Sequence, residues 1–319
     1  MVESGTESLS CIVVNRNTAD LLITCLERLF ASELDHEPEV VVVDNGSTDD
    51  SVGRVRARFP QVEVLEAGKN LGFSAAVNRG VKRSTGELIL VVNTDALLDG
   101  DCCRTLAELM MTVPKVGMTG PQLLNEDGSF QTSYEAVPTL ATETLNRSLL
   151  KRLFPSRFPS KTRRLFAPEP VEALIGAVVM IRRIALEQLG GFDEDYFFFL
   201  EETDLALRMR MAGWTVMHDP RARAVHLQGA TANTFQSAAR IEFYRSRYIF
   251  FRKHHGFPSE LFLKAVLTAN LFLNSLFLGL LAVATLGKVP RIRDRFRVRT
   301  DLLAWHLRGC PQSAGLPRD

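Results

Sequence analysis

Residues 39–51 read EVVVVDNGSTDDS, a run of four valines that ends in an aspartate and a turn-forming Asn-Gly-Ser cluster. A short β-branched run bounded by turn residues predicts a buried strand. The strands expected in this way are 9–15 (LSCIVVN), 39–44, 62–66 and 87–93 (ELILVVN). Residues between them place apolar side chains at helical spacing, over 19–31, before Phe59 and over 73–83. Strands that alternate with helices predict an α/β fold with a mostly parallel sheet covered on both faces.

The charge of the chain is unevenly distributed. Its 319 residues carry 38 Lys and Arg against 37 Asp and Glu, a formal net charge of +1. Residues 240–319 hold 14 basic and 5 acidic side chains, whereas the first 239 residues hold 24 and 32. An acidic body followed by a basic tail predicts that the tail meets an anionic partner. The composition, 46% hydrophobic and 24% charged, excludes a fibrous or wholly disordered chain.

Polar groups follow the predicted strands at the sheet edge where open parallel sheets bind ligands. Asp44 ends the valine run, and either shapes the turn or accepts hydrogen bonds from a nucleobase. Asp95 follows the fourth predicted strand, at 87–93, and either caps a helix or offers a hard oxygen to a divalent metal on a diphosphate. The loop at 70–74 opens a helix that contains Asn78, and its glycine lets the backbone approach a ligand closely.

A further acidic cluster, EETD at 201–204, begins a helix predicted over 201–212. On that helix Glu202 shares the apolar, core-facing stripe, where a carboxylate is costly unless it is used or paired. We interpret Glu202 as a base that can take a proton from a sugar hydroxyl. Asp204 and Arg208 have the i,i+4 spacing of an ordinary structural ion pair.

His226 follows the apolar run at 222–225. A histidine in such a position is usually a buried, hydrogen-bonded core residue. Its combination with Asp95 and Glu202 makes it a candidate metal ligand.

Two later segments mix basic and apolar residues. Residues 145–166 carry seven Lys and Arg and no acid, which is typical of a solvated loop or of a flap over an anionic, lipid-attached substrate. Residues 261–287 are long enough to span a bilayer, but basic residues flank both ends, so a single span would leave one flank on the wrong side. We expect an in-plane helix or re-entrant hairpin at the membrane, with a core or dimer helix as the alternative.

Several signals bear on compartment and partner. The five cysteines form no CxxC pair, and the first ten residues lack the basic and apolar regions of a signal peptide. We therefore expect a cytoplasmic protein, peripheral on the inner face of the cell membrane. P-loop and GxGxxG signatures are absent, which argues against an NTPase or a dehydrogenase. The basic tail carries no recognised nucleic-acid-binding motif, and its apolar run suits lipid better, so we expect no nucleic-acid partner.

Seven stretches along the chain form an ordered set. They are VVNRN at 13–17, VVVDNGSTDDS at 41–51, NLGFSAAVNRG at 70–80, LVVNTD at 90–95, GAVVMIRR at 176–183, LGGFDEDYFFFLEETDLALRMRMAGW at 189–214 and VHLQG at 225–229. The set closely resembles the family 2 inverting glycosyltransferases, particularly the bacterial rhamnosyltransferase-like branch that acts on lipid-linked glycans. The resemblance covers about residues 9–250.

The resemblance implies a GT-A fold over residues 1–235, with a Rossmann-like nucleotide-sugar half over about 1–120 and an acceptor half over about 121–235. Residues 236–319 are then a basic and apolar helical C-terminal region that associates with the membrane. The sheet is mostly parallel and flanked by helices in this interpretation.

The resemblance also implies roles for individual residues. Asp44 matches the aspartate that contacts the nucleobase of the donor, and Glu202 matches the residue that acts as the catalytic base. Asp95 matches the metal-binding last position of the DxD motif, and His226 matches a histidine that completes the site for Mg²⁺ or Mn²⁺. The nucleotide-sugar site is expected to include Asn15, Asn17, Asp44, Asn70, Gly72, Asn78 and Asn93.

The sequence departs from the family pattern at three points. The DxD motif reads Asn-Thr-Asp at 93–95, so one acidic ligand is missing and the metal affinity is expected to be modest. The base is Glu202 where Asp is usual, which lengthens its reach by one methylene. The QxxRW motif of processive synthases is absent after residue 230, which favours the addition of a single sugar.

The expected reaction is one in-line displacement with inversion. Glu202 deprotonates the acceptor hydroxyl, and a divalent metal neutralises the departing nucleoside diphosphate. The resemblance favours dTDP-rhamnose as the donor over UDP- and GDP-sugars, and a lipid-linked or cell-envelope polysaccharide as the acceptor. The alternative is a non-catalytic, membrane-tethered, nucleotide-binding scaffold of the same fold. Acceptor identity, linkage and oligomeric state are left open, a homo-oligomer included.

Overall fold

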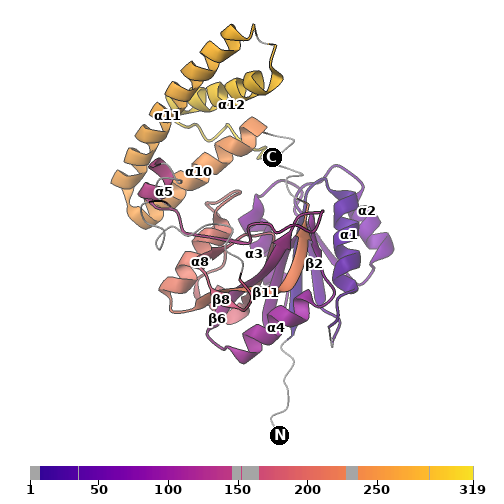
Figure 1. Ribbon diagram of the computed structural model, residues 1–319. Helices are drawn as coiled ribbons and strands as arrows, with labels where there is room; N and C mark the ends of the chain where they lie inside the picture. Colours follow the sequence, from indigo (N-terminus) through magenta and orange to yellow (C-terminus); the bar gives the residue numbers. More distant parts are fainter. Residues whose placement is uncertain are drawn as a thin grey trace.

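The computed structural model describes residues 8–34, 36–145, 152, 165–227, 236–286 and 288–318 (Figure 1). A layered α/β body is followed by three long helices that project from one end of it. Most of the basic segment at 145–166, which we interpreted as a loop or flap, lies outside the described residues.

The first part of the body is a parallel sheet. Strands β1 (Leu9–Asn15), β2 (Glu39–Asp44), β3 (Glu63–Glu66) and β4 (Leu88–Asn93) lie in the order β3-β2-β1-β4 and run parallel. They alternate with helices α1 (Ala19–Phe30), α2 (Ser51–Arg58) and α3 (Phe73–Arg83). The prediction of a parallel α/β arrangement for this region is confirmed.

The second part of the sheet is mixed. The order continues as β4-β10-β6-β11-β5, and β10 runs antiparallel to both of its neighbours. Its elements are β5 (Ala96–Leu98), α4 (Cys102–Thr112), β6 (Val116–Leu124), β10 (Val178–Arg182), α7 (Arg183–Gln188), α8 (Glu201–Met211) and β11 (Thr215–His226). The smaller elements are β7 (Tyr134–Glu135), α5 (Leu140–Thr144), β8 (Glu169–Pro170) and β9 (Ala173–Leu174). β8 joins β11 at the side, and β7 pairs with β9 as a separate ribbon.

The sheet is buried on both faces, which explains why its strands are continuously apolar rather than alternating. Along β1, Cys11 and Val13 pack with α1, α2 and α4 on one face. Ile12 points to the other face, where α3, α7 and α8 supply the core. The side chains of successive residues therefore belong to two separate cores.

The helices α10 (Gln236–His255), α11 (Phe257–Ala284) and α12 (Pro290–Leu307) form a third core of their own. Tyr196 and Leu200, from the loop before α8, belong to this core and join it to the body. By length and composition α11 could cross a membrane, a property shared by core helices of soluble proteins. Only 22% of its most apolar stretch is buried, however, and large side chains such as Phe272 and Phe277 are exposed.

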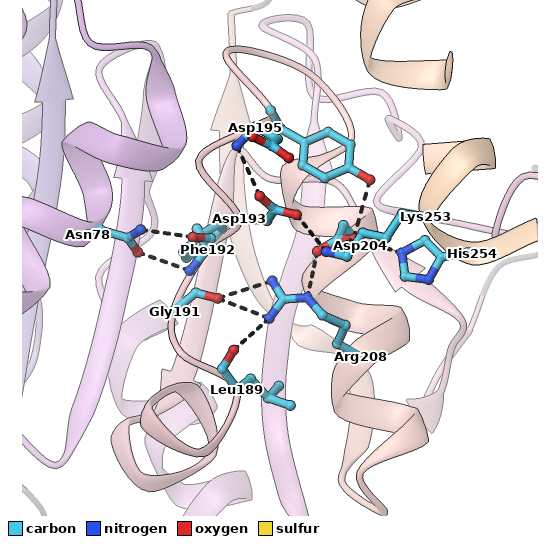
Figure 2. A network of polar contacts seen from close by, with 11 residues as sticks. Asn78, Leu189, Gly191, Phe192, Asp193, Asp195, Asp204, Arg208, Lys253 and His254 are labelled. Atoms are coloured by element: carbon cyan, nitrogen blue, oxygen red, sulfur yellow. Dashed lines mark hydrogen bonds and ion pairs between the residues drawn. The ribbon is translucent and has the colours of Figure 1, made fainter. Parts of the chain in front are cut away.

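A buried ionic network also joins the bundle to the body (Figure 2). The carboxylate of Asp204, on α8, is fully buried and accepts bonds from Arg208 of the same helix at 2.6 Å and from Lys253 of α10 at 2.8 Å. His254 Nε2 lies 2.7 Å from the same carboxylate, and the Tyr196 hydroxyl donates to it at 3.3 Å. The i,i+4 pair expected from the sequence is thus the centre of a larger cluster.

The segment after α12 returns to the α/β body. The side-chain amide of Asn70 donates to the carbonyl of Pro317 at 2.7 Å, and Arg318 donates to Glu242 at 2.7 Å. The Arg318 guanidinium also lies over the ring of Phe197, 4.3 Å from its centroid. Residues 311–318 therefore close over the edge of the sheet that carries the predicted site.

Candidate active site

A cavity of about 310 Å³ opens at the carboxyl ends of β1 and β4. This is the edge where open α/β sheets bind ligands. Among the predicted site residues, those that line it are Asn70, Gly72, Asn93, Asp95, Glu202 and His226. Its lining also includes Arg16, Thr18, Asn45, Thr94, Gly176, Phe197, Phe198, Phe199, Glu201 and Leu316. Residues from eight separate stretches of sequence therefore meet around one space.

Asp95 and His226 lie side by side because β5 pairs antiparallel with β11, with Ala96 opposite His226. The distance from Asp95 Oδ1 to His226 Nε2 is 3.5 Å, and each side chain is 14% exposed. Gln131 lies on the far side of the imidazole, with its Oε1 3.1 Å from Nδ1. The Gln131 amide nitrogen donates to the His226 carbonyl and to Asn125, which orients its oxygen toward the ring.

This pair fits a divalent metal as two of its ligands. The Gln131 oxygen favours a proton on Nδ1, which leaves the Nε2 lone pair facing the cavity beside a carboxylate. Mg²⁺ and Mn²⁺ commonly bind to few protein groups and take their other ligands from phosphates and water. Within the described part of the chain, no three His, Cys, Asp or Glu side chains gather around a common point. A metal held here would therefore complete its coordination with the donor diphosphate and water.

Glu201 and Glu202 begin α8 and both line the cavity. Burial, and to a lesser extent the charge of Glu135, raises the pKa of Glu202 to about 7. Backbone hydrogen bonds donated to its carboxyl, including one from Gly176, lower the pKa but do not offset this rise. Burial and the neighbouring charge of Glu202 raise the pKa of Glu201 well above its usual range. Both carboxyls therefore hold a proton more tightly than an exposed glutamate does, and Glu202, whose pKa lies near neutrality, is the candidate for proton exchange.

The backbone before these two residues is unusual. Phe199 and Leu200 have φ angles of 74° and 66°, the left-handed region that residues with a Cβ rarely adopt. Such conformations cost about 1–3 kcal/mol each and are held by their surroundings. Here the Phe198 carbonyl accepts a bond from Ser246 of α10, and Leu200 packs in the helical-bundle core. The strained turn places Glu201 and Glu202 at the cavity.

Gly176 and Gly72 let the walls of the cavity approach closely. A Cβ on Gly176 would lie 3.3 Å from Glu202 Cγ and Cδ, so the absence of a side chain leaves room for the carboxyl. Gly72 has φ 85°, and a Cβ there would lie 2.6 Å from the Phe197 carbonyl oxygen. The amide of Phe73 donates to that same carbonyl at 2.7 Å. The loop at 70–74 thus packs directly on the aromatic run before α8.

Asp44, Asn15 and Asn17 lie behind the cavity rather than in its lining. The register of β1 on β2 places Asn15 opposite Asp44, and the Asn15 amide donates to the carboxylate at 3.2 Å. Asp44 also accepts from the amide of Ser47, while the Asn17 side chain accepts from the amide of Thr48. These bonds hold the Asn-Gly-Ser turn at the end of β2. The roles of Asp44, Asn15 and Asn17 toward a nucleotide stay predictions.

Asn78 lies apart from the other predicted site residues and does not line this cavity. Its side chain bonds to both backbone groups of Phe192, at 2.8 and 2.9 Å (Figure 2). It also donates to Glu194 at 2.9 Å. In this structure Asn78 joins α3 to the loop before α8. Its predicted contact with the donor stays a prediction.

Some lining and supporting residues were not singled out from the sequence. Gln131 orients His226 from a separate loop, and Glu135 acts on Glu202 through charge across the β7–β9 ribbon. No local pattern marks either one, because both act through long-range packing. Gly176 begins the quoted GAVVMIRR stretch, and Arg16 lies inside VVNRN, so position within those motifs was an available signal.

The fold and the site define the class of protein. A parallel Rossmann-like half, a mixed second half and an acidic cavity at their common edge are the arrangement of GT-A glycosyltransferases. The family model "Glycosyl transferase family 2" matches residues 10–190. The chain therefore belongs to glycosyl transferase family 2, and it is a glycosyltransferase rather than a non-catalytic scaffold.

Relatives refine this assignment. The chain is 31% identical over 251 residues to the N-acetylglucosaminyl-diphospho-decaprenol L-rhamnosyltransferase of Mycobacterium tuberculosis, covering 72% of this chain and 81% of that protein. The resemblance to a rhamnosyltransferase-like branch is confirmed by this match. Arg16, Asp44, Asp95, Glu202 and His226 have no role assigned by the match itself, so their roles stay proposals.

Solved structures agree on the fold. The mannosyltransferase PcManGT from Pyrobaculum calidifontis, in complex with GDP-Man and Mn²⁺, is 20% identical with a TM-score of 0.59, covering 97% of this chain and 89% of that one. Residues 1–349 of TarS from S. aureus are 16% identical with a TM-score of 0.54, covering 82% and 69%. The predicted GT-A fold is thereby confirmed, and a divalent metal occurs with a nucleotide sugar among its structural neighbours.

Proposed function

We propose that this glycosyltransferase moves one sugar, with inversion, from a nucleotide sugar to a lipid-linked acceptor. The observation that carries the proposal is the cavity in which Glu202, with a pKa of about 7, faces the Asp95–His226 pair. A base that titrates near neutrality is matched to the deprotonation of a hydroxyl at physiological pH. Because the leaving diphosphate needs no general acid, a single base suffices, unlike the paired carboxyls of a hydrolase.

Glu202 is the proposed base, and Glu201 is the neighbouring carboxyl, whose pKa is also raised by burial. The acceptor hydroxyl gives its proton to the Glu202 carboxylate while its oxygen bonds to the anomeric carbon. The bond from that carbon to the diphosphate oxygen breaks in the same step, on the opposite face of the sugar. The hydrogen bond from the Gly176 amide to Glu202 orients the carboxylate for this transfer.

Asp95 and His226 are the proposed protein ligands of a divalent metal. When bound, the metal supplies positive charge that offsets the charge developing on the departing diphosphate. An imidazole ligand beside a single carboxylate favours Mn²⁺ over the harder Mg²⁺. Asn93, which stands where a second acid is usual, leaves the protein with fewer anionic ligands and so with a modest affinity for the metal.

The proposed donor is dTDP-rhamnose and the proposed acceptor is a sugar on a lipid diphosphate. Support comes from the relative in Mycobacterium tuberculosis, whose name gives rhamnose as the sugar moved and N-acetylglucosaminyl-diphospho-decaprenol as the acceptor. Within the donor site we assign the nucleobase to the surroundings of Asp44 and Asn45. We assign the diphosphate to the side of the cavity that carries Arg16 and Asp95.

A lipid-linked acceptor calls for contact with a membrane. The exposed apolar residues of α11 and the five arginines between residues 291 and 299 of α12 are suited to lie on an anionic leaflet. We therefore propose peripheral attachment to the cytoplasmic face of the cell membrane through residues 236–319, with the transferase domain over 1–235. Sedimentation with membranes, and release by high salt plus mild detergent, tests this; full solubility at low salt contradicts it.

The function itself is tested by sugar transfer. The full chain is given labelled dTDP-rhamnose, UDP-sugars or GDP-sugars with a polyprenyl-lipid fraction, in the presence of Mn²⁺, Mg²⁺ or EDTA. Metal-dependent label in the lipid from dTDP-rhamnose alone is the expected result. Label from another donor overturns the rhamnose assignment, and transfer to soluble glycans alone overturns the lipid-linked acceptor.

A further inference from the structure

A second cavity, of about 850 Å³, lies within the helical bundle between α10, α11 and α12. It is larger than the catalytic cavity, and its lining combines basic and aromatic side chains. The residues of these two kinds are Phe199, Arg240, Phe243, Tyr244, Arg295 and Arg299. Asp294 is the one acidic residue among the described residues that line it. The cavity therefore presents three guanidinium groups against one carboxylate.

The arginine that α10 contributes to this cavity differs from two others on that helix, whereas no arginine of α12 pairs with a residue that the structure describes. Within α10, Arg245 pairs with Glu242, and Arg247 pairs with Glu143. Arg240, Arg295 and Arg299 make no hydrogen bond or ion pair with any residue that the structure describes. Three like charges around one space repel one another unless an anion lies between them. Guanidinium groups are the side chains best suited to bind phosphate oxygens in pairs.

The two cavities share a wall. Phe199 lines both of them, and it is one of the two residues with left-handed backbone immediately before Glu201. A ligand with an anionic group among the arginines can therefore extend past Phe199 toward Glu202. Leu271 of α11 also lines the cavity. The next two residues of that helix, Phe272 and Leu273, are exposed.

This arrangement matches the three parts of a lipid-linked acceptor in order. An apolar helix face lies where a lipid chain would run, three arginines lie where a diphosphate would sit, and the base lies beyond Phe199. We propose that the cavity between α10, α11 and α12 binds the diphosphate of a polyprenyl-diphosphate acceptor through Arg240, Arg295 and Arg299. The inference rests on the proposed function, because it names the part of the acceptor that this surface recognises. Headgroups of membrane phospholipids do not require a path to Glu202, and the shared wall therefore favours the acceptor.

The α12 helix offers a matched pair of variants. Arg295 and Arg299 line the cavity, whereas Arg293 and Arg297 have the same i,i+4 spacing on the same helix and lie outside the lining. Arg293, Arg295 and Arg297 are exposed, and Arg299 is half-buried. R295Q/R299Q and R293Q/R297Q remove the same charge from the same segment. Binding of farnesyl diphosphate to the full chain is measured by calorimetry in detergent micelles, with farnesol and inorganic pyrophosphate as further probes and phosphatidylglycerol vesicles as the control surface.

The expected result is selective. R295Q/R299Q weakens farnesyl diphosphate binding by about tenfold or more, whereas R293Q/R297Q changes it less than about twofold. Both variants weaken binding to phosphatidylglycerol vesicles to a similar extent, because that attraction depends on total surface charge. Equal loss of farnesyl diphosphate binding in the two variants, or no loss in either, overturns the proposal. Equal binding of farnesol and farnesyl diphosphate to the unaltered chain overturns it as well.

Kinetics separate this proposal from the proposed function. In sugar transfer to the polyprenyl-lipid fraction, R295Q/R299Q is expected to raise the KM for the lipid acceptor by about tenfold and to leave the KM for the donor unchanged. Unchanged acceptor KM with active transfer refutes the arginine site while the proposed function stands. If the unaltered chain transfers no sugar to lipid, the proposed function fails, and the binding comparison alone decides whether the cavity recognises a diphosphate.

Discussion

Two carboxyl groups in the first turn of α8, the half-buried Glu202 and the fully buried Asp204, differ sharply. Glu202 faces the cavity, and its pKa rises to about 7 because burial and the charge of Glu135 oppose ionisation. Asp204 faces the helical bundle, and its pKa is lowered to about 2. Burial there is outweighed by hydrogen bonds and charges from His254, Arg208 and Lys253.

The difference shows how one helix turn serves two purposes. A buried carboxylate bonded to two cations and a histidine stabilises the contact between two parts of a protein, and it stays ionised at every physiological pH. A buried carboxylate that faces a cavity without such partners holds its proton near neutrality and can exchange it with a substrate. Each prediction below tests one side of this contrast between Glu202 and Asp204.

The largest expected effect is on catalysis. E202Q removes the proposed base and keeps the shape of the side chain, so sugar transfer should fall by about 10²- to 10⁴-fold. Binding of dTDP, measured by calorimetry, should change less than about twofold. E201Q is the matched control: it removes the neighbouring carboxyl of the same helix turn and leaves the proposed base in place, so it should cost far less activity. Loss of dTDP binding in E202Q would contradict the assignment of Glu202.

The same variant should gain stability at high pH. A carboxyl with a raised pKa favours the folded state below about pH 4.5, and this contribution is lost as the pH rises through about 7. Above pH 7 Glu202 is ionised in the folded state, and its charge there lowers the free energy of unfolding. The neutral amide of E202Q does not carry this charge. We expect E202Q to be more stable than the unaltered chain by about 1–3 kcal/mol at pH 8 and equal to it near pH 4, as measured by urea unfolding.

The next largest effect is on folding. D204N leaves Arg208, Lys253 and His254 around an uncharged amide, and the free energy of unfolding at pH 7 should fall by about 3–5 kcal/mol. The contribution of Asp204 is present above about pH 4 and is lost as the pH falls toward 2, so the deficit of D204N should shrink in acid.

An exposed ion pair provides the control for this measurement. Asp20 bonds to Arg54 at 2.7 Å, but its side chain is 91% exposed. D20N should therefore change the free energy of unfolding by less than about 1 kcal/mol. If D20N and D204N destabilise equally, burial of the Asp204 cluster is not the source of its strength.

A smaller effect is expected from the glycine beside the base. A Cβ at Gly176 lies within 3.3–3.4 Å of Glu202, so G176A should displace the carboxyl by a few tenths of an ångström. We expect kcat to fall by about fivefold to tenfold with little change in the donor KM. G53A on α2, where a Cβ would meet nothing within 4 Å, should leave kcat unchanged. An unaltered kcat in G176A would show that Glu202 tolerates this shift.

The smallest effect is a displacement of the pH profile. Glu135 raises the pKa of Glu202 through its charge, so E135Q should lower it and move the acid limb of kcat to lower pH. At pH 6, relative to each enzyme's own plateau, the rate of E135Q should exceed that of the unaltered chain by about threefold. E126Q, in an exposed turn, should leave the profile in place. A shift to higher pH would contradict the proposed influence of Glu135.

The sequence predicted the parallel half of the fold closely, because each strand and helix there carries its own periodic signal. The predicted bounds of 9–15, 39–44 and 73–83 are those of β1, β2 and α3. The antiparallel insertion of β10 between β4 and β6 was beyond reach. Its pairing depends on packing between segments almost ninety residues apart, and no local pattern encodes that.

The site was predictable where function leaves a motif. The spacing around Asp95, Glu202 and His226 led to side chains that do line one cavity. The spacing around Asn78 led instead to a residue that joins α3 to a loop, because a polar side chain in a helix looks the same whether it meets a ligand or a backbone. Partners such as Gln131 and Lys253 act across long sequence separations, and only the folded structure brings them into contact.

The bond from Asn70 to the carbonyl of Pro317 joins residues 247 positions apart. During synthesis on the ribosome, the parallel half of the sheet can therefore form long before the segment that covers its edge has been made. Leu316, which that segment contributes to the catalytic cavity, emerges after all three helices of the bundle. This cavity is consequently completed only after the three helices of the bundle have been synthesised.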